Sequence, residues 1–113
     1  MTMTSIKNAG NTSITITVKF YGVFRKIAGK KELTHQTTTR TLKEALNELT
    51  SRLPPQFKEA LIDQVLDNPT PNALILINGK EMSVLEGLGT LLKNGDRIII
   101  IPISHGGLLA PNI

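Results

Sequence analysis

Hydrophobic and polar residues alternate near the start of the chain, from Ser13 to Tyr21. One side of an extended chain would carry Ile14, Ile16, Val18 and Phe20, and the other would carry Thr15, Thr17 and Lys19. This period of two predicts a half-buried strand. The segment GVFRKIAGKK, with Gly22 and Gly29, then predicts a turn, and the Thr-rich ELTHQTTT predicts an outer strand. The two strands are therefore expected to form a hairpin.

A helical pattern begins at Thr41, because Thr41 and Glu44 have the spacing of a capping box. Apolar residues then recur every three or four positions, which predicts one buried stripe against a sheet. The stripe consists of Leu42, Ala45, Leu46, Leu49 and Leu53. Pro54 and Pro55 end this helix. A second, shorter helix is predicted in FKEALIDQVL, with Phe57, Ala60, Leu61, Val65 and Leu66 roughly on one side.

The rest of the chain predicts two buried strands joined through turns. ALILIN, residues 73–78, is apolar on both faces, which places it inside the sheet, and Asn78 with Gly79 indicates a tight turn. SVLEGLGTLL predicts a helical turn with an extended link, and KNGD predicts another turn. RIIIIPI, residues 97–103, is the second buried strand.

This order of elements predicts an α+β fold. With the last strand beside the first, the fold is a β-grasp, the ubiquitin-like architecture, with a mixed four- to five-stranded sheet, one main helix and a shorter second helical segment. The 113 residues suffice for one domain, which we expect at 13–103. We expect a disordered segment at 1–12 and a flexible tail at 104–113.

Composition narrows the function. The net charge of +4 comes from Lys and Arg spread along the chain, and aromatic residues are few, so a nucleic-acid partner is not expected. The chain has no cysteine, which excludes a thiolate nucleophile. Since no apolar run approaches membrane length and no signal peptide is apparent, we expect a cytoplasmic protein without a membrane partner.

Catalysis by side chains is not expected. The sequence has no Ser-His-Asp order, no phosphate-binding glycine loop and no cluster with metal-ligand spacing, so we predict no enzyme activity and no bound cofactor or metal. His35 and His105 are interpreted as exposed surface residues. Asp96 and Arg97 are interpreted as turn and strand-end residues, and Glu44 as a helix cap.

Two adjacent glycines, Gly106 and Gly107, follow the last predicted strand. Without Cβ atoms, this pair could enter a narrow channel and bring a carboxyl carbon close to another molecule. This geometry suits chemistry on the main chain, although a flexible linker is the commoner explanation for two glycines taken alone.

Several segments together resemble the ubiquitin-like sulfur carriers, which include the small subunit of molybdopterin synthase, the thiazole-synthesis sulfur carrier and the ubiquitin-related modifier. VKFYGVFRKIAGKKEL resembles the first hairpin of the molybdopterin subunit, and TTTRTLKEALNELTSRLP resembles the first helix of the family. NALILINGKEM and TLLKNGDRIIIIPISHGG resemble the closing strands and the glycine tail. The ending SHGG is closer to that of the ubiquitin-related modifier. The resemblance covers about Thr15 to Gly107.

The resemblance implies that the protein is a substrate of an E1-like activating enzyme. That enzyme uses ATP and magnesium to join AMP to the terminal glycine carboxylate. A persulfide then attacks to give a thiocarboxylate, or a lysine amine attacks to give an isopeptide bond. Gly106 and Gly107 would be the activated tail, with His105 and Ser104 positioning it. The partner surface is expected on the sheet face beside the tail.

The chain departs from the family pattern because LLAPNI follows Gly107. We therefore expect a precursor that is cut between Gly107 and Leu108 by a peptidase, for which a metalloprotease is one candidate class; the alternative is that the extension is kept. Three functions remain open. The first is a modifier and sulfur carrier acting on target-protein lysines or a sulfur-accepting enzyme. The second is a small subunit of molybdopterin synthase, whose tail enters the large subunit and donates sulfur to a pterin precursor. The third is an interaction module that is never activated.

Overall fold

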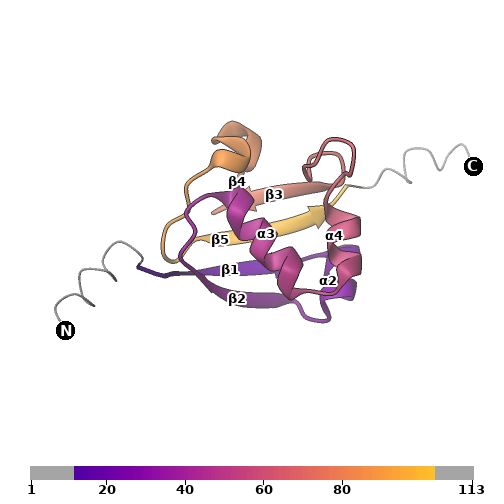
Figure 1. The fold of residues 1–113 in the computed structure, drawn as a ribbon, viewed down its shortest axis with the longest axis horizontal. Coiled ribbons are helices and arrows are strands. Elements are labelled where there is room, and N and C mark those ends of the chain that lie inside the picture. Colours follow the sequence, from indigo (N-terminus) through magenta and orange to yellow (C-terminus); the bar gives the residue numbers. More distant parts are fainter. Residues whose placement is uncertain (1–11, 104–113) are drawn as a thin grey trace, which may run out of the picture.

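Five strands form one mixed sheet in the computed structural model, which describes residues 12–103 (Figure 1). The strands are β1 (Ile14–Phe20), β2 (Glu32–Thr37), β3 (Ala73–Ile77), β4 (Lys80–Glu81) and β5 (Arg97–Pro102). Their order across the sheet is β2-β1-β5-β3-β4. The terminal segments predicted at 1–12 and 104–113 lie, apart from Thr12, outside the described residues.

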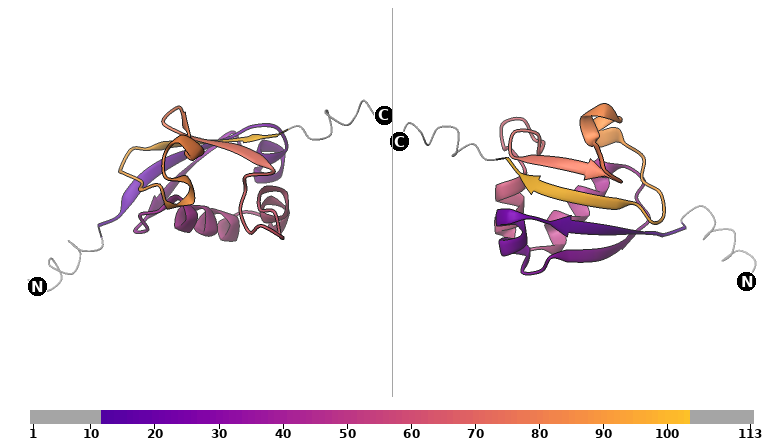
Figure 2. Two further views of the ribbon diagram at one scale, coloured as in Figure 1. Left: turned by 90° about the horizontal axis from the view of Figure 1, so that it is seen from above. Right: turned by 180° about the vertical axis from the view of Figure 1, so that it is seen from behind.

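The first and last strands lie side by side and parallel, with Val18 opposite Ile98 and Phe20 opposite Ile100. β2 pairs antiparallel with the outer side of β1, and β3 pairs antiparallel with the other side of β5. This arrangement confirms the predicted β-grasp fold. All the α-helices cover the same face of the sheet, and the opposite face is uncovered within the described residues (Figure 2).

The connection between β1 and β2 is a helix, α2 (Gly22–Ala28), so the turn predicted for GVFRKIAGKK was wrong. The helix forms because Phe24 enters the core, where its ring centroid lies 5.5 Å from that of Phe57. Gly29 ends the helix in the left-handed conformation with φ of 77°, and its N–H donates to the Arg25 carbonyl. The two strands are therefore antiparallel neighbours as expected, but they are joined by a helix.

The main helix, α3 (Leu42–Arg52), begins with the predicted capping box. The Glu44 N–H donates to the Thr41 hydroxyl, and a Glu44 carboxylate oxygen accepts from the Thr41 N–H. These bonds satisfy two of the N–H groups that a helix start leaves free. The buried stripe is as predicted for Leu42, Ala45, Leu46 and Leu49.

The second helix, α4 (Pro55–Leu61), is shorter than predicted. Phe57 and Leu61 are buried, but Val65 and Leu66 are 91% and 58% exposed, so their predicted place on an apolar helix face was wrong. The helix ends because the Asp63 carboxylate accepts hydrogen bonds from the N–H groups of Val65 and Leu66 and holds a turn there.

β3 lies inside the sheet as predicted, between β5 and the two-residue β4. Asn78 and Gly79 form the predicted turn, with φ of 52° and 86°. The link to β5 contains two short 3₁₀ helices, η1 (Met82–Val84) and η2 (Gly87–Gly89). Among the described helices, none has the length and apolar character needed to cross a membrane.

His35 is buried, so its predicted place on the exposed surface was wrong. The alternation of β2 points Leu33, His35 and Thr37 toward the helices. There the His35 Nε2 lies 2.8 Å from the Glu48 Oε1, and the Arg52 guanidinium lies 3.0 Å from the His35 Nδ1. Because the guanidinium can only donate, Nδ1 accepts and the ring proton lies on Nε2, toward Glu48.

Candidate functional site at the exit of the C-terminal tail

The predicted site residues Ser104, His105, Gly106, Gly107 and Leu108 lie outside the described residues. What the structure places is the point from which they start, at Ile103 just beyond β5. The chain leaves the domain between α2 on one side and the loop of residues 62–72 on the other (Figures 1 and 2). The exit is therefore the last described point of the chain before the diglycine.

Hydrogen bonds and packing hold both sides of the chain at the exit. The Ile103 N–H donates to the Asn72 carbonyl at 3.0 Å on the β3 side, and the Tyr21 N–H donates to the Ile100 carbonyl at 3.1 Å on the β1 side. Pro102 packs against the backbone of Gly22, the first residue of α2. The start of the tail is thus fixed to the domain up to Ile103.

Aromatic packing supports the same end of the domain. Phe57 of α4 lies between Phe20 at the end of β1 and Phe24 of α2, with ring centroids 5.4 Å and 5.5 Å away. All three side chains are fully buried. The Phe20–Phe57 pair is edge-to-face and the Phe24–Phe57 pair is tilted, and aromatic contacts of this kind stabilise the packing beyond the burial of area alone. They fix α2 and α4 against the sheet, and so fix one wall of the exit.

An apolar cluster lies on the uncovered face of the sheet, beside the exit. Leu74 faces Ile101 across the β3–β5 pair, and Leu76 faces Ile99. These four side chains, which we call the open-face cluster, are half-buried, whereas the residues between them point into the core. Ile103 continues the same alternation and is 39% exposed. The row of Ile99, Ile101 and Ile103 therefore runs along β5 to the tail.

Lys19 and Tyr21 border this cluster on the β1 side. Lys19 pairs with Ile99 in the register of the sheet. Its ammonium lies 5.4 Å from the centre of the Tyr21 ring, a cation–π contact. The open face next to the tail thus combines an apolar centre with a positive and aromatic border, a composition typical of protein interfaces.

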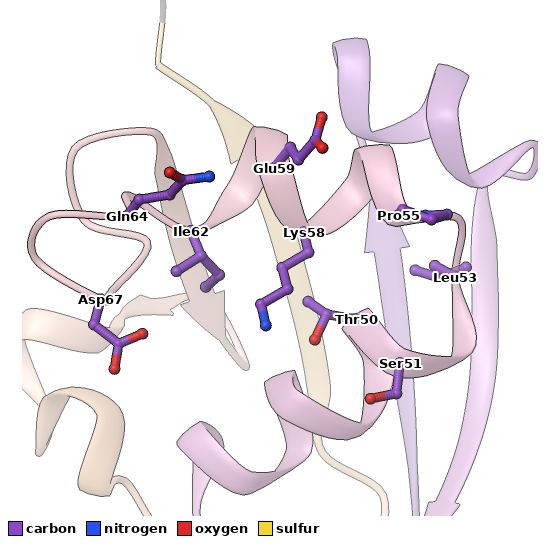
Figure 3. Close-up of a pocket in the computed structure, with 9 residues that line it drawn as sticks. All are labelled: Thr50, Ser51, Leu53, Pro55, Lys58, Glu59, Ile62, Gln64 and Asp67. Atoms are coloured by element: carbon purple, nitrogen blue, oxygen red, sulfur yellow. The ribbon is translucent and has the colours of Figure 1, made fainter.

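A groove of about 710 Å³ lies on the opposite, helical side of the molecule (Figure 3). Its lining comes from α3, α4 and the loop after α4, namely Thr50, Ser51, Leu53, Pro55, Lys58, Glu59, Ile62, Gln64 and Asp67. The Lys58 amine projects into the groove, and Asp67 lies at its loop end (Figure 3). Its charges are mixed, and no set of three potential metal ligands occurs among residues 12–103.

One buried polar network contains a carboxyl group, that of Glu48, whose pKa is shifted. The pKa of the Glu48 carboxyl lies below its ordinary value of 4.5, chiefly because the Thr37 side chain donates a hydrogen bond to it. His35 acts in the same direction, and partial burial acts against both. The network joins β2 to α3, on the far side of β1 from β3, and its groups face one another. It therefore stabilises the fold and does not extend to the tail exit.

The expectation of a partner surface on the sheet face beside the tail stays a prediction, and the sequence did not indicate which residues would line that face. Leu74, Leu76, Ile99 and Ile101 lie in runs that are apolar at every position, so the sequence did not distinguish core from surface. Only the strand register, which sets Leu74 against Ile101, shows that they form one cluster. The available signal for β5 was Arg97, whose charge favours the open face and so puts Ile99 and Ile101, two and four residues on, on that same face.

Comparisons with known proteins show which family and fold this chain resembles. The model of the ThiS family matches residues 18–107, which include the diglycine. No curated protein sequence matches the chain. The small archaeal modifier protein 1 of Methanosarcina acetivorans is 31% identical, with a TM-score of 0.72 over 84% of this chain and 98% of that protein.

Two further structures share the fold. Urm1 of Trypanosoma brucei is 26% identical, with a TM-score of 0.69 over 85% of this chain and 98% of Urm1. A CysO chain seen in a complex with BexX from Amycolatopsis orientalis is 22% identical, with a TM-score of 0.67 over 81% of this chain and 99% of that one. The chain therefore belongs to the ThiS family of ubiquitin-like sulfur carriers.

Proposed function

We propose that this chain is the precursor of a protein modifier and sulfur carrier whose reactive group is the carboxylate of Gly107. A peptidase removes LLAPNI, and an E1-like enzyme then activates the new terminus. The observation that carries the proposal is that Gly106 and Gly107 lie three and four residues beyond Ile103, the last described residue of a ThiS-family domain.

Activation is needed because a carboxylate is a poor acceptor for nucleophiles. In the proposed step, a Gly107 carboxylate oxygen attacks the α-phosphate of ATP, pyrophosphate leaves, and magnesium bound by the enzyme offsets the phosphate charge. A lysine amine can displace AMP to give an isopeptide bond. Alternatively, the terminal sulfur of a persulfide displaces AMP, and a thiol cleaves the resulting acyl disulfide to leave the thiocarboxylate.

The described residues supply position and recognition. Because the chain is held at Ile103 by Asn72 and at Pro102 by Gly22, the diglycine starts from a fixed point. The open-face cluster next to that point offers an apolar surface to the enzyme that receives the tail. Ser104 and His105, the two residues between Ile103 and the glycines, are proposed to position the tail in that enzyme.

A second candidate function is sulfur donation within a molybdopterin synthase, where the tail would enter the large subunit. The similarity of VKFYGVFRKIAGKKEL to the first strands of the small subunit favours it. Both functions use the same activated Gly107 and differ in the acceptor. Tagging gives adducts on other proteins, whereas sulfur donation predicts a large subunit that copurifies tightly.

The intact mass of the protein purified from its own cells tests the proposal. A form ending at Gly107 is expected, carrying either the increment for replacement of oxygen by sulfur or a bond to a lysine of another protein. Protein present only as the uncut 113-residue chain would contradict both candidate functions and would leave an unactivated interaction module.

A further inference from the structure

The loop between α4 and β3 presents two apolar side chains to solvent at its tip. Val65 is 91% exposed and Leu66 is 58% exposed. Single exposed apolar residues are common on protein surfaces. These two are adjacent, however, and the packing of the turn gives no reason for apolar residues at these positions.

Hydrogen bonds fix the shape of this tip, which we call the Val65–Leu66 tip. The Asp63 carboxylate accepts from the N–H groups of Val65 and Leu66, both at 2.9 Å. The Asp63 N–H donates to the Asn68 carbonyl, and the Asp67 N–H donates to the Asp63 carbonyl. A binding partner would therefore lose little of its binding free energy to ordering this loop.

The same loop is joined to the start of the tail. Its residue Asn72 accepts from the Ile103 N–H, and the Asn72 side chain donates to the Leu61 carbonyl at the end of α4. Asn72 is the part of the loop that lies at the exit, and the left view of Figure 2 shows the rest of the loop extending toward the helical side of the sheet. The loop that carries the tip is thus hydrogen-bonded to Ile103, the last described residue before the tail.

Exposed apolar side chains gather at this end. Among residues 12–103, five of the seven large apolar side chains that are strongly exposed lie on the segments around the exit. They are Tyr21, Val23, Val65, Leu66 and Ile103. The other two, Val84 and Leu91, lie between β4 and β5, at the opposite end of β3 and β5.

Chain length limits how far a partner of the tail can stand from this end. Gly107 is four residues beyond Ile103, and four residues span at most about 14 Å. An enzyme that holds the Gly107 carboxylate in a recessed site must therefore bring its own surface against the residues around the exit. The Val65–Leu66 tip is among the most exposed of these residues.

Charged side chains lie on both sides of the exit. Arg25 and Lys26 lie exposed on the α2 side, and neither forms an ion pair within the described part of the chain. The loop side is mixed, with Lys58 and Glu59 on α4 and Asp67 on the loop. Gln64 and Asp67, which flank the tip, also line the groove, so that a hollow adjoins the protruding tip (Figure 3).

We propose that the Val65–Leu66 tip is a docking contact for the E1-like enzyme that activates Gly107, separate from the open-face cluster. The matching surface of that enzyme has an apolar recess for the tip and acidic groups toward Arg25 and Lys26 of α2. This inference rests on the proposed function, because it takes the activating enzyme as the partner.

Adenylation kinetics with purified activating enzyme test the inference. The protein ending at Gly107, which keeps every described residue, is compared with its V65S/L66S variant by ATP–pyrophosphate exchange. The matched control is V84S/L91S, which removes one Val and one Leu that are 70% and 67% exposed at the opposite end. Thermal unfolding verifies that both variants keep the fold, as expected for exposed positions.

We expect V65S/L66S to raise the KM for the carrier about tenfold at unchanged kcat, and V84S/L91S to leave both unchanged.

An unchanged KM in V65S/L66S, with the original protein still adenylated, overturns the inference but leaves the proposed function standing. A fall in kcat alone also overturns it. Self-association of the original protein that V65S/L66S abolishes assigns the tip to a second copy instead. If the original protein is not adenylated, the proposed function fails and the inference fails with it.

Discussion

Gly22 and Pro102 touch so closely that no side chain fits between them. A Cβ built on Gly22 would lie 2.6 Å from the Cγ of Pro102, and Gly22 has a φ of +53°. This contact joins the first residue of α2 to the last residue of β5, one residue before Ile103, from which the tail continues. It therefore fixes where the tail leaves the domain.

Gly22→Ala is predicted to destabilise the protein through both the clash and the positive φ. Gly29→Ala is the matched control, since Gly29 has a φ of +77° and nothing within 4 Å of an added Cβ. We expect the control to lose about 1 kcal/mol, and Gly22→Ala to lose about 1–3 kcal/mol more because the added methyl overpacks the contact. Urea unfolding measures both. Equal losses of unfolding free energy would show that Pro102 shifts to make room for the added methyl group and does not fix the exit.

The helix that starts at Gly22 also shows where the sequence was insufficient. Gly22 and Gly29 indicated a turn, but their role is to begin and end a seven-residue helix. Phe24 with Ile27 and Ala28 has helical spacing, yet the segment is too short for that signal to outweigh two glycines. The decisive interaction is the contact of Phe24 with Phe57, which is distant in sequence.

The strongly patterned elements were predictable because local chemistry determined them. Thr41 and Glu44 fixed the start of α3 through a capping box, and the alternation of β1 fixed its buried face. His35 was not predictable in the same way. Its burial depends on pairing with Glu48 and Arg52 of α3, a contact that appears only when β2 and α3 pack together.

The open-face cluster is predicted to contribute to recognition by the activating enzyme. Leu74→Ser removes an apolar side chain that faces Ile101 on the uncovered side of the sheet. We expect the KM for the carrier in the adenylation reaction to rise about tenfold while kcat stays constant, because an apolar contact with the enzyme is lost. Leu91→Ser, at the opposite end of β5, serves as the control. If both variants had the KM of the original protein, the open face would not be the docking surface.

Glu48 is predicted to make the stability depend on acid pH. Its folded-state pKa is lowered below the ordinary 4.5, so it stabilises the fold fully above about that pH. This contribution is lost as the pH falls through the folded-state pKa, because the unfolded chain then binds the proton more readily. Since the side chain is 38% exposed, solvent screening keeps the effect small.

Urea unfolding between pH 7 and pH 3 measures this dependence in the original protein and in Glu48→Gln. The variant is expected to be less stable at neutral pH and to lose less stability on acidification. Glu59→Gln, which replaces an exposed glutamate of α4, should keep the steeper pH profile of the original protein. A Glu48→Gln profile parallel to that of the original protein would assign the acid sensitivity to other carboxylates.

Activation at Gly107 is the central claim, and it is tested most directly by ATP–pyrophosphate exchange with the purified activating enzyme and two forms of the carrier. One form is the full chain, which ends at Ile113, and the other ends at Gly107. We predict exchange only with the form that ends at Gly107, because only that form exposes the glycine carboxylate. Equal exchange with both forms, or none with either, would contradict the account.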